Sequence, residues 1–269
     1  MVIFCPRRTA VAAAACGVLV GLLSACGATN APGDDNGRAP GGSSPSAGGA
    51  RATAPGTVGT TRIPGVGDRL GGRVPTDSRQ VLAVYGDGKD SARSTAVLYT
   101  RGAAKSGGAA RDGRWRPARS WDAHNGRRGW TLDHHENDKR SPVGVFTLSD
   151  AGGVLPAPAA DPAAGSSLPY TRSAAFAAPH GWPRAYWHDF DYVIAIDYNR
   201  VRGTAPNDPV RPQGQDKGGG IWLHMDHGSG TSACVSLPEP AMAYLLRTLD
   251  PKLHPVVVMG DRADLGAAA

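Results

Sequence analysis

Residues 221–238 read Ile221-Trp222-Leu223-His224-Met225-Asp226-His227-Gly228-Ser229-Gly230-Thr231-Ser232-Ala233-Cys234-Val235-Ser236-Leu237-Pro238, and this stretch decides how the chain is interpreted. It opens with a short apolar run, Gly220 to His224, which is typical of a strand that ends at the histidine. The glycines at 228 and 230 form a flexible loop that can turn Cys234 back towards that strand. From Pro238 to Leu249 apolar residues recur three and four positions apart, which predicts a helix packed beneath the segment that carries Cys234.

Cys234 is the only cysteine beyond residue 26, so it cannot form a disulfide within the mature chain. Three roles fit a solitary thiol. With His224 as the base it can be a nucleophile, because an imidazole can take the thiol proton. It can be an inert core residue, since a free cysteine behaves as a small hydrophobe. With His224 and His227 it offers three ligands, as many as a catalytic zinc uses.

The residues around Cys234 can supply the other parts of a thiol-based site. Small side chains before the thiol leave the backbone N–H groups of Ala233 and Cys234 accessible as oxyanion donors. A main-chain carbonyl suffices to orient His224, because holding the tautomer requires only a hydrogen-bond acceptor. The segment therefore favours nucleophilic catalysis without requiring a cofactor or metal.

The N-terminus is typical of an exported lipoprotein. Arg7 and Arg8 precede an apolar stretch from about Ala10 to Leu23, and Leu23-Ser24-Ala25-Cys26 resembles a bacterial lipobox. We expect residues 1–25 to be a signal peptide and Cys26 to carry the lipid, on the outer face of the cell membrane facing the wall. An uncleaved membrane anchor is the alternative, but a membrane-spanning helix needs about 20 apolar residues, and the stretch from about Ala10 to Leu23 is shorter than that.

Composition divides the rest of the chain. Residues 26–75 are rich in Gly, Pro, Ser and Ala without apolar periodicity, which predicts a disordered tether, and residues 263–269 are predicted to be a disordered tail. Residues 76–262 are predicted to be one mostly β domain. Strands are expected over residues 80–85, 94–100, 143–148, 192–197, 220–224 and 255–259. The first two read as a hairpin, and 151–183 reads as a long irregular connection that either lines a cleft or is a plain surface loop.

The net charge of the protein gives a weak indication of the molecules that it binds. The formal net charge is +6, and removing the two leader arginines leaves +4 without a concentrated basic block. Nucleic acid is therefore not an expected partner, whereas a polyanionic cell envelope suits this charge.

Three segments in order resemble the L,D-transpeptidase (YkuD-like) family. The active-site run from Ile221 to Pro238 is similar to that family's, Ser141-Pro142-Val143-Gly144-Val145-Phe146 resembles its Thr-Pro-x-Gly-x-Phe strand, and residues 190–199 resemble the strand before the active site. The resemblance implies a mostly β domain, a β-sandwich or mixed sheet with one or two short helices. It implies that Cys234 attacks the third residue of a peptidoglycan stem peptide through a thioester, with His224 as base and the Met225 carbonyl orienting the ring.

The chain departs from that pattern at four positions. Ser-His-Gly-Cys is replaced by Thr231-Ser232-Ala233-Cys234, and Ser236 stands where the family has an arginine. The added Cβ of Ala233 requires a negative φ there. The absent arginine removes a candidate partner for a substrate carboxylate. A degenerate lipoprotein that only binds wall peptides, or an L,D-carboxypeptidase that uses water, therefore stands beside the transpeptidase.

Several other side chains are candidates for binding substrate. Thr231, Ser232 and Trp222 belong to the active-site run, whereas Arg140 and His135, with His134 and Lys139, precede the Ser141-Pro142 strand and can instead be part of a solvated loop. Trp182, Tyr186 and Trp187 either line the cleft or pack in the core. His227 reads as a loop histidine.

Overall fold

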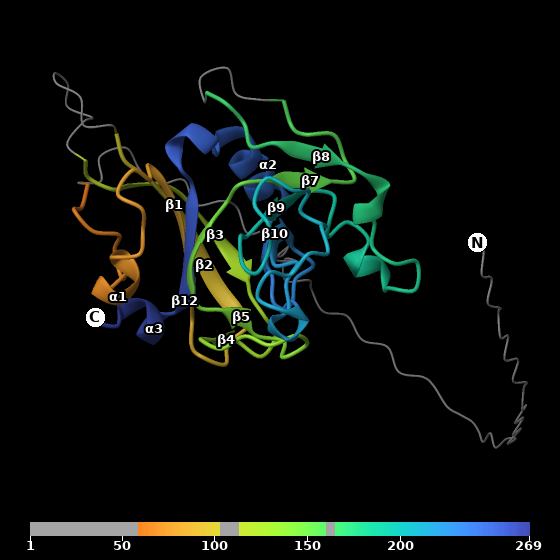
Figure 1. The fold of residues 1–269 in the computed structure, drawn as a ribbon, viewed down its shortest axis with the longest axis horizontal. Coiled ribbons are helices and arrows are strands. Elements are labelled where there is room, and N and C mark those ends of the chain that lie inside the picture. Colours follow the sequence, from red (N-terminus) through yellow and green to blue (C-terminus); the bar gives the residue numbers. More distant parts are fainter. Residues whose placement is uncertain (1–58, 103–112, 160–164) are drawn as a thin grey trace, which may run out of the picture. The chain divides into compact units, whose positions relative to one another are not determined.

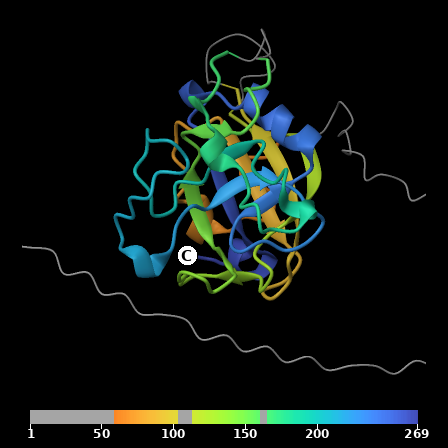
Figure 2. The same cartoon turned by 90° about the vertical axis from the view of Figure 1, so that its right-hand side faces the viewer.

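The computed structural model describes residues 59–102, 113–159 and 165–269, and within them the fold is mostly β with three short α-helices (Figure 1). A ten-stranded mixed sheet runs in the order β6-β12-β1-β2-β3-β11-β10-β9-β7-β8, and β4 pairs with β5. Figure 2 shows the same sheet turned by 90°. The strands are β1 (Gln80–Gly86), β2 (Arg93–Thr100), β3 (Arg116–His124), β4 (Trp130–Thr131), β5 (Ser141–Pro142), β6 (Gly144–Thr147), β7 (Ala151–Gly153), β8 (Tyr170–Arg172), β9 (Val193–Ala195), β10 (Trp222–Met225), β11 (Val235–Leu237) and β12 (Val256–Asp261).

The centre of one half of the sheet is formed by β1 and β12. Every residue of both strands is buried, and they pair in parallel from Val81 beside Val256 to Gly86 beside Asp261. A strand covered on both faces needs a nearly continuous apolar run rather than an alternating one. β2 returns antiparallel to β1, which confirms the predicted hairpin.

The other half of the sheet carries the residues of interest. β10 and β11 pair in parallel, and β11 joins β3 through Ser236 beside His124. The helix α2 (Glu239–Thr248) follows β11 directly and buries Ala241, Met242 and Leu245, which confirms the helix predicted over 238–249. Pro238 immediately precedes it, where a fixed φ and a missing N–H are tolerated.

The predicted ends of the folded domain were wrong. The helix α1 (Asp68–Gly71) lies inside the predicted tether and buries Leu70, while the helix α3 (Arg262–Gly266) lies in the predicted tail and buries Leu265. The two ends meet, because the Gly67 N–H donates to the Leu265 carbonyl at 2.8 Å. Residues 1–58, with the predicted signal peptide, Cys26 and most of the tether, lie outside the described residues. No helix in the described ranges is both long and apolar enough to cross a bilayer.

One long strand was not predicted. β3 runs Arg-Pro-Ala-Arg-Ser-Trp-Asp-Ala-His and carries polar or charged residues at most positions. It forms because β2 pairs with it along its whole length, with a register shift between Leu98 and Tyr99. Only Trp121 and Ala123 of β3 are buried, so its own sequence gives little β signal.

Candidate active site

The strand pairing places Cys234 and His224 on the same face of the sheet. Leu223 pairs with Val235 and His224 with Ser236 in a parallel ladder. Both Leu223 and Val235 are fully buried in the core, so the neighbouring positions point to the opposite face. Cys234 immediately precedes β11, and the Trp222 N–H, two positions before His224, donates to its Sγ at 3.4 Å. The Cys234 and His224 side chains line one pocket of about 410 Å³.

His224 is held in a single tautomer. Its Nδ1 lies 2.7 Å from the Met225 carbonyl oxygen, which only accepts hydrogen bonds, so Nδ1 carries the proton. Nε2 is therefore the basic nitrogen. Burial lowers the pKa of His224 to about 4, against an opposing contribution from the Met225 carbonyl. The ring is neutral at physiological pH and available as a base.

The thiol of Cys234 is also neutral in this structure. The Trp222 N–H donates to Sγ at 3.4 Å, and Sγ lies 3.6 Å from the Gly220 carbonyl oxygen, to which the thiol donates. Burial raises the pKa of Cys234 to about 12, and the charge of Asp189 acts in the same direction. An ion pair of thiolate and imidazolium is thus disfavoured at rest, and the proton has to move as the sulfur attacks a bound carbonyl.

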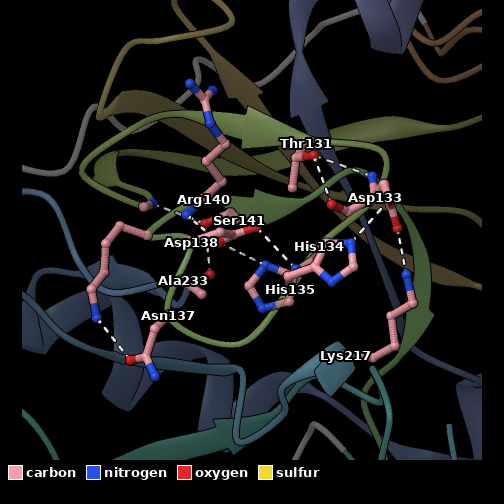
Figure 3. A network of polar contacts seen from close by, with 12 residues as sticks. Thr131, Asp133, His134, His135, Asn137, Asp138, Arg140, Ser141, Lys217 and Ala233 are labelled. Carbon is pink, nitrogen blue, oxygen red and sulfur yellow. Dashed lines mark hydrogen bonds and ion pairs between the residues drawn. The ribbon is translucent and has the colours of Figure 1, made fainter. Parts of the chain in front are cut away.

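The backbone around the thiol is fixed by buried side chains. The Ser141 hydroxyl donates to the Ala233 carbonyl at 2.6 Å and accepts the Gly126 N–H at 2.9 Å. The Thr231 hydroxyl donates to the Cys234 carbonyl at 2.6 Å. Figure 3 shows Ser141 and Ala233 facing one another beside the 131–140 loop. Ser141, from the Ser-Pro-x-Gly-x-Phe segment, therefore positions the cysteine.

Two backbone donors are left open at the thiol. Across the described ranges, the N–H groups of Ala233 and Cys234 donate to no protein acceptor. Among the non-glycine residues described, those with positive φ are Asn137, Lys139, Asn199 and His254, so the alanine at 233 is not in a strained backbone conformation. Free amides beside a nucleophile can stabilise an oxyanion.

The lining of the pocket includes an aromatic wall of Trp182, Tyr186 and Phe190 and a polar wall of Arg127, Thr231 and Ser232. A second, smaller pocket of about 80 Å³ reaches Cys234 from the side of His134, Asn137 and Lys139. The nucleophile is thus reached from two directions.

The other predicted substrate contacts are placed differently. Arg140 pairs with Asp90 at 2.7 Å, and His135 is largely exposed and pairs with Asp133, as Figure 3 shows for the loop around His135; neither lines a pocket that contains Cys234. The Trp222 indole donates to the Pro206 carbonyl at 3.0 Å and packs against Phe190. Trp187 is about half exposed and lies outside the pocket lining.

Three residues that line the pocket of Cys234 were not predicted from the sequence to do so. Arg127 follows β3, which itself was not predicted, and Asp189 lies in a turn before β9. His227 reads as a loop residue, but its side chain is buried beside Asp189, at 3.0 Å between Nδ1 and Oδ2. Within the described part of the chain, no three His, Cys, Asp or Glu side chains gather as metal ligands, and this includes His224, His227 and Cys234.

Comparison with known proteins supports the family resemblance. Residues 77–258 match the model of the YkuD family, the L,D-transpeptidase catalytic domain. Neither the curated proteins nor the solved structures contain a match to the chain. The family match covers more than half of the sequence and extends from before β1 into β12. The chain therefore belongs to the L,D-transpeptidase catalytic domain (YkuD) family, whose function concerns peptidoglycan.

Proposed function

We propose that the chain is a cysteine-dependent L,D-transpeptidase that acts on peptidoglycan stem peptides. The observation that carries this proposal is that His224 of β10 and Cys234, which immediately precedes the paired strand β11, line one pocket. The Met225 carbonyl fixes the His224 tautomer that leaves Nε2 basic. Proximity and a defined tautomer are what an otherwise neutral thiol needs to become a nucleophile.

Acylation follows from these contacts. Sγ of Cys234 attacks the carbonyl carbon of the third stem residue while Nε2 of His224 takes the thiol proton. The N–H groups of Ala233 and Cys234 donate to the oxyanion of the tetrahedral intermediate. The C–N bond then breaks, His224 protonates the departing D-alanine amine, and a thioester remains on Cys234.

The acceptor that attacks the thioester determines which product forms. An amine of a second stem attacks the thioester and gives a cross-link, whereas water gives a trimmed stem. The large pocket and the second approach to Cys234 favour a second peptide over water alone, since both partners of a cross-link are bulky. An L,D-carboxypeptidase remains the alternative activity.

Arg127 supplies a charge that position 236 does not. Ser236 is buried and its hydroxyl donates to Asp226 at 2.7 Å. Its side chain therefore makes a contact within the protein and carries no charge for a substrate carboxylate. Arg127 is exposed and lines the pocket, and among the described residues its guanidinium makes no ion pair. We propose that it binds a carboxylate of the stem peptide, because a guanidinium fits a carboxylate with two parallel hydrogen bonds.

The test is a covalent adduct on the mature chain. We expect a carbapenem to add its mass once to the wild type and not to Cys234→Ala, as read by intact-mass spectrometry. A synthetic stem tetrapeptide should lose its terminal D-alanine with the wild type alone. Muropeptide binding without either adduct or product in the wild type would contradict catalysis and establish the binding-only lipoprotein instead.

We further propose that the protein is exported and anchored to the outer face of the cell membrane through a lipid on Cys26. The positively charged start, the apolar stretch and the Leu23-Ser24-Ala25-Cys26 box support this proposal. We expect Cys26→Ala to move the protein from the membrane fraction to the soluble fraction of bacterial cells. Membrane retention of that variant, with a cleaved N-terminus, would contradict lipid anchoring.

A further inference from the structure

Asp189 and His227 form a buried acid–histidine pair in the pocket of Cys234. Asp189 follows the short 3-10 turn Arg184–Tyr186, and His227 lies just beyond β10. The His227 Nδ1 is 3.0 Å from the Asp189 Oδ2, and each side chain is only 4% exposed. The backbone fixes the pair, because the Met225 N–H donates to the Asp189 carbonyl at 2.9 Å.

Acylation does not use this pair. His224 has its own orienting partner in Met225 and takes the thiol proton. His227 stacks parallel to His224 at 6.2 Å between ring centroids and packs against Tyr186 at 4.5 Å. Neither ring nitrogen of His227 has a well-aligned hydrogen bond to any described residue, even though Asp189 is close. Buried polar atoms without aligned partners are costly, so they point to a ligand that completes them.

Asp189 also lacks a strong cation. Among the described residues no lysine or arginine pairs with it; His227 is its one ion-pair partner. Burial raises the pKa of Asp189 to about 7, and the charge of Asp226 contributes in the same direction. The other charged or titratable groups that share this pocket or act on the pair are Arg127, Tyr186, His224, Asp226, His124 and Cys234.

The reaction itself brings a cation to this pocket. An acceptor amine is protonated at neutral pH, and an ammonium has no lone pair with which to attack a thioester. A buried carboxylate attracts an ammonium and stabilises it by a charge-assisted hydrogen bond. A carboxylate that titrates near neutral pH can also accept a proton and release it again.

We propose that Asp189, with His227 behind it, binds the primary ammonium of the acyl acceptor and removes its proton before attack on the Cys234 thioester. This assignment rests on the proposed transpeptidase function and deepens its second half. It makes Asp189 a catalytic residue for aminolysis and His227 a positioning residue.

The steps balance in protons and electron pairs. The Asp189 carboxylate takes one proton from the ammonium, and the freed nitrogen lone pair forms a bond to the thioester carbonyl carbon. The C–S bond breaks and its electron pair stays on sulfur. The nitrogen loses a second proton to Nε2 of His224, which returns it to the Cys234 thiolate. Asp189 then releases its proton to solvent through His227, so the net products are an amide, the free thiol and one proton.

The experiment separates aminolysis from acylation on the mature chain. The donor is a synthetic stem tetrapeptide whose side-chain amine is acetylated, and the acceptor probe is glycinamide. We expect Asp189→Asn to lower the ratio of amide to hydrolysed product by roughly 10²-fold, the usual contribution of a positioned base. Acylation by a carbapenem should not fall, because His224 and Cys234 are retained and the loss of the Asp189 charge removes one contribution that raises the pKa of Cys234. Asp122→Asn, on an exposed part of β3, is the matched control and should change neither quantity.

A pH profile excludes a merely structural role. In the wild type the aminolysis rate should level off above pH about 7, where Asp189 is ionised. In Asp189→Asn it should keep rising until the free amine itself is deprotonated in solution. Equal ratios and equal pH profiles in the two proteins would overturn the assignment, as would a parallel loss of acylation and aminolysis. An absence of any wild-type acyl adduct would instead overturn the proposed function and this assignment with it.

Discussion

The variant His224→Asn is expected to acylate Cys234 roughly 10³-fold more slowly than the wild type, within the range that a general base contributes. The reason is the resting state of the thiol: burial raises the pKa of Cys234 to about 12, so few molecules hold a thiolate before substrate binds. Without Nε2 of His224 the proton has no acceptor at the moment of attack. The measurement is the time course of the carbapenem adduct by intact mass.

The pH dependence gives an independent check on this base. Burial lowers the pKa of His224 to about 4, so the ring is neutral and active above pH about 5. The acylation rate should fall as the pH drops through about 4, where the ring becomes protonated. His135→Asn is the control, because His135 is exposed and outside both pockets at Cys234. A His224→Asn rate within tenfold of the wild type would assign the base to another group.

The variant Arg200→Leu is expected to lower the free energy of unfolding by about 3–5 kcal/mol, the usual cost of breaking a buried ion pair. The Arg200 guanidinium is 3% exposed and bonds to Asp150 at 2.9 Å and to Asp197, whose side chains are 6% and 1% exposed. Removing it leaves Asp150 buried without its cation and leaves Asp197 with only the exposed Arg202 at 3.6 Å. The cluster joins the β6–β7 connection to the end of β9, so it supports the strand beside β10. Urea unfolding followed by fluorescence measures the change.

Arg202→Leu is the matched control for that prediction. Arg202 also approaches Asp197, at 3.6 Å, but its side chain is largely exposed. Exposed ion pairs contribute about 0–1 kcal/mol, so this variant should unfold nearly as the wild type does. Similar losses from both arginines would show that burial of the cluster does not determine its contribution.

Local pattern predicted the elements whose sequence and burial agree. β1 and β12 are continuous apolar runs because both faces of each strand are covered, and α2 has apolar residues at helical spacing. β3 was missed because its polar residues are held by pairing with β2 rather than by burial. The ends α1 and α3 were missed because each is a single turn that buries one leucine against the sheet.

The residues of the candidate site also fall into a group that the sequence predicts and a group that it does not. Cys234, His224 and Met225 lie within one short segment, so spacing and family resemblance predict them as site residues, and in the structure the His224 Nδ1 lies 2.7 Å from the Met225 carbonyl oxygen. Asp189 and Arg127 come from segments distant in sequence, and only the folded sheet brings them to the thiol. No local pattern marks a lone aspartate in a turn as part of a pocket.

The two walls of the pocket are attached to the protein in different ways. Thr231 exchanges backbone hydrogen bonds with Asn125 and Arg127, so the cysteine loop is tied to the end of β3. In the aromatic wall, the Trp182 and Tyr186 N–H groups bond only to carbonyls three residues earlier. If stem peptides are the substrates, as proposed above, we expect bulkier ones to displace the aromatic wall rather than the cysteine loop. The backbone that carries Cys234 would then keep its position, so changes in residues 182–187 could alter tolerance for donor size without moving the thiol.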